Sequence, residues 1–154
     1  MPTNFLWGPV GTVMNLLTTE LNSLANNSGS AVGPEINNSG GLQLGQLSLL
    51  IASNSLAFTV ASMVKVFLVP SDDTAGGNYP TYTSGASYKL AESNYLVGVI
   101  SINPATQSAN VVRETLPYVP IPLGKFKAIL VSNAGVTLPS SGNTLNLYPT
   151  PNQY

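Results

Sequence analysis

The chain lacks cysteine and histidine and has very few charged residues. Its 154 residues contain no Cys and no His, and charged side chains make up only 7% of them. Without Cys there is no disulfide, no thiolate nucleophile and no zinc cluster of the usual kind. Without His, the commonest general base and the commonest transition-metal ligand are missing. We therefore expect that the chain is not an enzyme and that it holds no cofactor.

The scarcity of charge also suggests what the surface is for. About 25% of residues in typical soluble domains are charged, whereas this chain has five basic and six acidic residues. Ser, Thr, Asn, Gln and Gly take their place, and neutral polar groups cost less to desolvate than charged ones. Such a surface suits burial against other proteins, including further copies of the chain. Five scattered basic residues predict no direct contact with nucleic acid.

A charge-free run over residues 36–64 is long enough to span a bilayer. It contains Gln43, Gln46 and Asn54, however, and Gly45 interrupts it, whereas a membrane helix is more continuously apolar. The start, MPTNFLWGPVG, has neither the basic region nor the long apolar run of a secretory signal. We therefore expect two strands and a turn here, and no membrane partner.

Leucine spacing predicts one amphipathic helix near the start of the chain. In TVMNLLTTELNSLANN, residues 12–27, Val13, Leu17, Leu21 and Leu24 recur at spacings of three and four. The polar positions between them are mediocre helix formers, so packing must hold such a helix. We expect its leucine face to contact a partner or to form the core of an oligomer.

Large apolar side chains also precede this segment. Phe5, Leu6 and Trp7 lie on a short arm between Pro2 and Pro9. The arm could tuck onto its own domain, or it could reach into a neighbouring subunit, because exposed aromatic groups suit such docking. Both alternatives are open at this point.

From residue 42 onward the hydrophobic period changes to two, which is typical of strands. Clusters of Gly, Pro, Asn and Ser separate six predicted strands, at residues 42–52, 58–69, 88–102, 108–116, 125–133 and 143–149. No helical pattern separates them, which favours an antiparallel β-sandwich of jelly-roll type. We expect residues 1–30 to form the arm and helix, and residues 31–154 to form the sandwich domain.

Two details of these strands can be tested. Alternation in the second strand places Phe58, Val60 and Val64 on one face. Pro117, Pro120 and Pro122 bar a central strand, so their segment should be an extended edge or a crossing connection.

Asp72 and Asp73 form a pair of adjacent acids in the loop LVPSDDTAGGNYPTY, residues 68–82. A calcium site needs six or more oxygen ligands, and no Glu completes the set here. Asp, Gly and Pro are also the residues that favour turns. We interpret the pair as the tip of a solvated loop, and whether it binds a metal stays open.

Three tyrosines, Tyr79, Tyr82 and Tyr88, flank this loop. Aromatic groups near a loop can stack on sugars or anchor a protein contact. They can also cover the edge of their own sheet. We favour a protein contact or such a cover over a glycan site.

The order of segments along nearly the whole chain carries a resemblance. The leucine-spaced segment and a Gly/Ser/Asn linker are followed by VKVFLVPSDDTAGGNYPTY and by LPYVPIPLGKFKAILVSNAGVTLPSSGNTLNLYP. In this order they resemble small virion structural proteins of tailed bacteriophages. Such proteins are often capsid cement (decoration) proteins and sometimes tail or neck components. The resemblance implies a β-sandwich or jelly roll bound at capsomer junctions, and it carries over no active-site residues.

Together, these observations lead us to expect a bacteriophage virion structural protein, specifically a capsid cement protein on the capsid exterior, made in the host cytoplasm. It would bridge the major capsid protein or other virion proteins as a homo-oligomer. The alternatives are a tail or neck component, or a glycan-binding adhesin module. We expect no catalytic, cofactor-binding or metal-binding residues, and the predicted partner-binding residues are Phe5, Leu6, Trp7, Leu17, Leu21, Leu24, Tyr79 and Tyr82.

Overall fold

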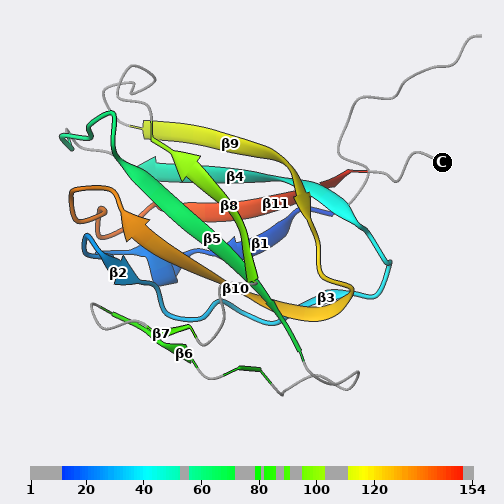
Figure 1. Cartoon of the computed structure of the whole chain (residues 1–154). Coiled ribbons are helices and arrows are strands. Elements are labelled where there is room, and N and C mark those ends of the chain that lie inside the picture. The colour runs from blue at the N-terminus through cyan, green and yellow to red at the C-terminus, as the bar shows by residue number, and fades with distance from the viewer. Residues whose placement is uncertain are drawn as a thin grey trace, which may run out of the picture.

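The computed structural model describes residues 12–52, 56–71, 79–80, 82–85, 89–90, 95–102 and 111–150. A single 3-10 turn, Thr19–Leu21, is the helical element of these residues, and all other elements are strands. The strands are β1 Met14–Leu17, β2 Ser28–Gly29, β3 Ile36–Asn38, β4 Leu44–Ala52, β5 Met63–Pro70, β6 Tyr82–Thr83, β7 Lys89–Leu90, β8 Leu96–Ser101, β9 Val111–Pro120, β10 Gly124–Asn133 and β11 Thr144–Thr150 (Figure 1).

The long strands form two antiparallel sheets (Figure 1). Sheet A has the order β1-β11-β4-β9, and sheet B has the order β2-β10-β5-β8, with β3 pairing beside β2 along β10. The chain crosses between the sheets from β1 to β2, from β3 to β4, from β4 to β5, from β8 to β9, from β9 to β10 and from β10 to β11. The small β6–β7 hairpin lies in the connection between β5 and β8. The prediction of a mainly β, antiparallel fold is confirmed.

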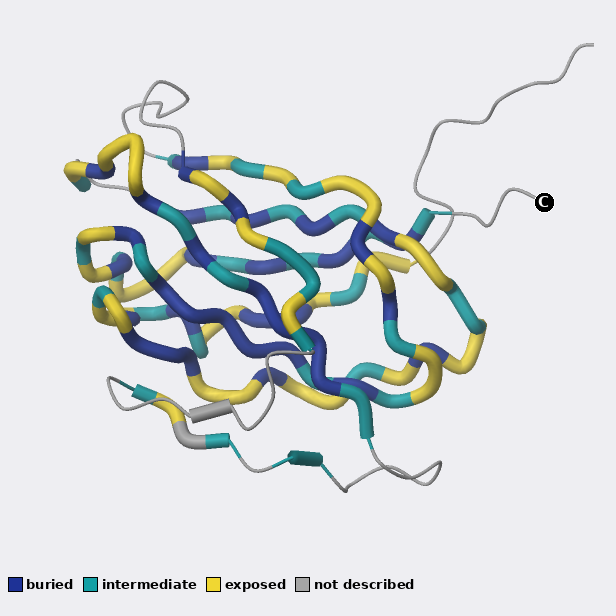
Figure 2. Tube along the Cα trace, viewed as in Figure 1, coloured by how far each residue is buried: buried dark blue, intermediate teal, exposed yellow. Residues whose placement is uncertain are grey.

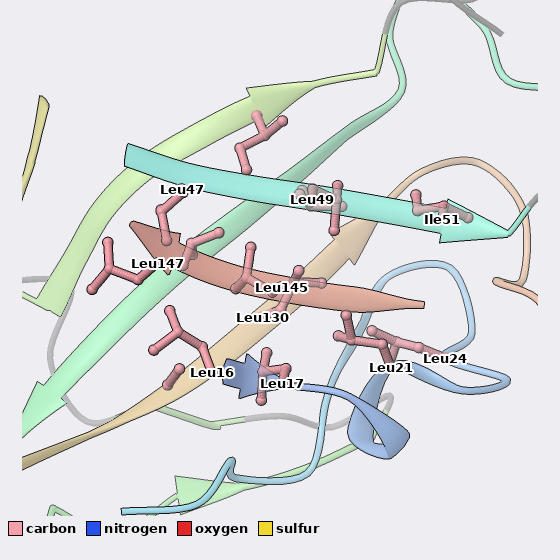
Figure 3. Packing of buried hydrophobic residues seen from close by; sticks show 14 of the residues in the cluster. Leu16, Leu17, Leu21, Leu24, Leu47, Leu49, Ile51, Leu130, Leu145 and Leu147 are labelled. Atoms are coloured by element: carbon pink, nitrogen blue, oxygen red, sulfur yellow. The ribbon is translucent and has the colours of Figure 1, made fainter. Parts of the chain in front are cut away.

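One apolar core lies between the two sheets. Every second residue of β4 and β11 points into it, and the pairs Leu47–Leu147 and Leu49–Leu145 lie directly opposite each other in the sheet. From sheet B, Leu130 enters the same cluster (Figure 3). Figure 2 shows buried and less buried residues alternating along the long strands, as a period of two requires.

The predicted helix over residues 12–27 is wrong. The segment forms β1, the 3-10 turn and the turn that leads into β2, and Ser23 and Asn27 adopt positive φ angles. Its polar residues explain this outcome, because Asn, Ser and Thr side chains compete with helical hydrogen bonds and favour turns. The backbone is bonded to a distant loop instead: the Ser23 amide donates to the Pro139 carbonyl at 2.9 Å.

The leucines of this segment therefore do not form a contact face. Leu17 and Leu21 are fully buried and Leu24 is 7% exposed, all in the core of their own chain (Figure 3). The leucines that recur at spacings of three and four belong to two different structures here, a strand followed by a tight turn. The prediction that these leucines bind a partner or form an oligomer core fails, because almost none of their surface is available. Through β1 and β2, residues 14–29 also belong to both sheets.

The second predicted strand begins later than expected. Residues 59–62 form a turn, in which the Ser62 hydroxyl accepts from the Thr59 amide at 2.9 Å and donates to the Ala134 carbonyl at 2.6 Å. Val60 lies at the tip of this turn and is 93% exposed, so it does not share the core face. Phe58 and Val64 are buried as predicted.

Strand β9 is the edge of sheet A, as its prolines predicted. It pairs with β4, and Gly45 and Leu47 of β4 lie opposite Val119 and Leu116 of β9. One extra residue of β9 therefore bulges between these pairs, and Tyr118 in this bulge has a φ of 58°. Prolines and bulges keep an edge strand from pairing with other chains.

We predict that Leu21→Ala lowers the free energy of unfolding by about 2–5 kcal/mol, because it leaves a cavity in the core. Val60→Ala is the matched control and should change stability by less than about 0.5 kcal/mol. Urea unfolding of both variants measures the difference. Equal, small effects would mean that Leu21 lies on a surface.

Candidate functional site

The outer face of sheet B is covered by its own chain. Phe67, Val69, Ile129 and Val131 point away from the main core and form a second apolar cluster. Tyr79, Tyr82 and Tyr95, from the connection between β5 and β8, pack against this cluster. This apolar face is therefore at least partly sealed within one molecule.

Polar contacts hold the tyrosines in place. The Tyr79 hydroxyl donates to Glu35 Oε2 at 2.8 Å, and the Tyr82 hydroxyl donates to the Ser30 carbonyl at 2.8 Å. Lys125 Nζ lies 3.1 Å from Glu35 Oε1, and Lys127 Nζ lies 4.3 Å from the centre of the Tyr79 ring. Glu35, Tyr79, Lys125 and Lys127 thus form one linked group, which we call the Glu35 cluster.

The cluster lowers the pKa of Glu35. The hydrogen bond from Tyr79 is the largest cause, and the hydrogen bond and charge of Lys125 act in the same direction. Desolvation opposes them. Each of these donors favours the carboxylate over the neutral acid.

Tyr79 and Tyr82 therefore serve their own fold. We expected these tyrosines to cover the edge of their own sheet. They do cover a sheet, but they lie on its outer face and not at its edge. Whether they also contact a partner stays a prediction. Tyr88, Asp72, Asp73 and the arm residues Phe5, Leu6 and Trp7 lie outside the described residues.

The outer face of sheet A has a different character. The register places alternate residues of its strands on this face, and most are exposed or half-buried. Arg113 carries the only charge among these described positions, which are Asn15, Leu44, Gln46, Ser48, Leu50, Ala52, Val111, Arg113, Thr115, Pro120, Thr144, Asn146, Tyr148 and Thr150. We call this surface the neutral face.

A row of neutral polar residues crosses the middle of the neutral face. Asn15 lies opposite Asn146, Asn146 opposite Ser48, and Ser48 opposite Thr115, so the row spans all four strands. Glu114, the neighbour of Arg113, pairs with the buried Leu49 and so lies on the core-facing side of sheet A. The two charged residues of β9 therefore lie on opposite faces of sheet A.

The described residues offer surfaces for contact. Within them, no group of three or more His, Cys, Asp or Glu side chains could hold a metal ion. No helix in the described part of the chain has the length and apolar character needed to cross a membrane. No protein-family profile matches the sequence, and no curated protein matches it.

Sequence reasoning missed the neutral face and the Glu35 cluster as units. The alternation of Lys125 and Lys127 with Phe126 does indicate that both lysines leave the core on the same side. The ion-pair partner of Lys125, Glu35, is 90 residues away in the chain, and nothing in the sequence indicates that β3 lies beside β10. The neutral face could have been found by marking every second residue of the strands in sheet A.

We predict that the fold loses stability as the pH falls through the lowered pKa of Glu35. A carboxylate with a depressed pKa stabilises the folded state above its unfolded pKa, and protonation removes this contribution. Tyr79→Phe deletes the main cause of the shift, so the Glu35 pKa should rise toward its ordinary value. NMR titration of the carboxyl carbon measures it.

Tyr82→Phe is the matched control, because its hydroxyl bonds a backbone carbonyl and not Glu35. It should leave the Glu35 pKa unchanged. Equal shifts in both variants would show that Tyr79 acts through general packing and not through its hydrogen bond.

Proposed function

We propose that this chain is a virion structural protein of a tailed bacteriophage, and specifically a cement protein that binds the outside of the capsid. The neutral face of sheet A is the observation that carries this proposal. A four-stranded surface with one charge can be desolvated against another protein at low cost. The similarity of the segment order to small virion proteins supplies the identity of the partner, the major capsid protein or another virion protein.

The size of the neutral face favours a multivalent arrangement. Four strands about 4.8 Å apart and up to ten residues long give an area on the order of 500 Å². Each partner in a standard interface buries about 800 Å². A homo-oligomer would present several copies of the neutral face. It would bind the shell more tightly than one copy does, because linked sites bind with a high effective concentration. Binding to assembled shell and not to free subunits would then stabilise the shell by mass action.

The strand order also supports the finer part of the proposed fold. We infer that sheets with the orders β1-β11-β4-β9 and β2-β10-β5-β8 form a jelly roll. Double-sheet jelly rolls occur in viral capsid domains and in lectins. Fold alone therefore does not choose between a capsid partner and a glycan.

The contacts of the tyrosines favour the capsid partner. A glycan-binding module would offer aromatic faces and free hydroxyls for stacking and hydrogen bonding. Here Tyr79 and Tyr82 pack on the sheet B cluster, and their hydroxyls donate to Glu35 and Ser30. A tail or neck component would use the same neutral face on a different partner.

The first experiment separates these placements. Virions of the encoding phage are fractionated into heads and tails, and the chain is located by its mass of 16.0 kDa. If the proposal is correct, the chain is found on heads. Mild treatment should release it from the heads, and purified protein that is added back should bind to them again. Its presence on tails alone would support the tail alternative, and its absence from virions would overturn the proposal.

The second experiment tests the neutral face. We predict that Ser48→Lys weakens binding to stripped heads about tenfold or more, since tenfold corresponds to about 1.4 kcal/mol and a buried, unpaired charge costs more than that. Ser101→Lys, on the exposed side of β8 in sheet B, is the matched control and should bind normally. Co-sedimentation with heads measures both. Unchanged binding of Ser48→Lys would place the contact elsewhere.

A further inference from the structure

Tyr118 is the one exposed aromatic residue among those that the structure describes. It is 65% exposed, whereas the other described Phe and Tyr residues are buried or half-buried. Tyr79 and Tyr82, by contrast, pack on sheet B and donate hydrogen bonds from their hydroxyls. The contacts of its own fold therefore cover little of the Tyr118 side chain.

The bulge in β9 turns Tyr118 out of the sandwich. Leu116 and Val119 both pack in the core, while Pro117 and Tyr118 between them are exposed. Side chains alternate along a regular strand, so with Leu116 inside, residue 118 would also point inward. The extra residue of the bulge instead places Tyr118 on the outer side of sheet A and returns Val119 to the core.

Tyr118 therefore extends the neutral face at the edge of sheet A. The two bulged residues lie opposite Gln46, and Gln46 lies opposite Tyr148 on its other side. None of these residues carries a charge. Arg113, the one charge among the described positions of the neutral face, lies near the other end of β9. The ring thus stands at the uncharged end of this face.

The backbone at Tyr118 is strained in a way that edge protection does not explain. Its φ of 58° lies in the left-handed region, which Asn or Gly adopts more easily than Tyr. Protection of the edge requires a bulge but no aromatic side chain. Strained residues cluster where binding depends on them. A contact made by the ring would explain why a tyrosine occupies this position.

We propose that Tyr118 is the anchor of the neutral face and inserts its ring into an uncharged, apolar pocket on the assembled shell. This inference rests on the proposed function and names the side chain that contributes most to binding. Tyrosine is one of the residue types that dominate binding energy at protein interfaces. A tyrosine can bury about 150–250 Å², which brings a face on the order of 500 Å² closer to the standard of about 800 Å².

Tyr118→Asn separates binding from folding. Because Asn adopts the left-handed angle more easily, we expect the melting temperature to rise by about 2–4 °C. Val60→Asn is the matched control on an exposed turn and should shift it by less than about 2 °C. Circular dichroism on heating measures both variants. A clear fall for Tyr118→Asn would mean that the ring serves its own fold, and the proposal would be wrong.

The same variant should bind stripped heads about 30-fold more weakly or worse, which is the loss typical of an interface hot spot. Tyr118→Phe keeps the ring and should stay within about tenfold of wild type, since it loses at most one hydrogen bond. Val60→Asn should bind as wild type does. Co-sedimentation over a range of head concentrations measures all three. A stable Tyr118→Asn variant with wild-type affinity would show that the ring is not the anchor.

Nitration of tyrosine rings tests the contact in the unaltered protein. In free protein, tetranitromethane should modify the exposed Tyr118 faster than the half-buried Tyr82 and Tyr148. On decorated heads, modification of Tyr118 should slow severalfold, because the pocket covers its ring. Mass spectrometry of the peptides measures the rates. Equal rates for Tyr118 in solution and on heads would place it outside the contact.

Failure of this inference can be told apart from failure of the proposed function. If Ser48→Lys weakens binding to heads and Tyr118→Asn does not, the neutral face is the contact and only the anchor is wrong. If wild-type protein does not bind heads, both proposals fail.

Discussion

The structure depends on one constraint: β4 and β11 must present their leucines to the same side while they pair with each other. Leu47 opposite Leu147 and Leu49 opposite Leu145 form a continuous apolar surface in the middle of sheet A. Because side chains alternate strictly along a strand, a slip of one residue would turn all of them to the solvent. This register also decides which residues form the neutral face, since its members are the residues between these leucines.

Much of the fold could be predicted because a period of two is a local signal. β4, β5, β8, β9, β10 and β11 all fall where alternating residues predicted strands, and the prolines of β9 marked it as an edge. Residues 12–27 could not be predicted in this way. Their leucines serve a strand of four residues and a single turn, which are too short to show a period. The pairings of β1 with β11 and of β2 with β10, far away in the sequence, help to decide their conformation.

The surfaces were harder to predict than the core, for a similar reason. The scarcity of charge indicated a surface suited to contacts, but not its location, because this depends on which strands are neighbours. On sheet B, Glu35, Lys125 and Lys127 contact one another or Tyr79 and so hold in place a tyrosine that packs on the outer face. Sheet A keeps one charge, Arg113, on its outer face, and turns Glu114 inward. The charged residues are thus distributed differently on the two outer faces, and their order in the sequence does not show this distribution.

The two outer faces of the molecule differ, so its two broad sides are not equivalent. Tyrosines cover part of one broad side, and the other side is open and carries one charge, Arg113, among its described positions. A body of this kind that adheres through its open side presents its closed side outward, where a further copy finds no equivalent surface. A coat built from it would stop at a thickness of one molecule, and this limit would need no separate regulator.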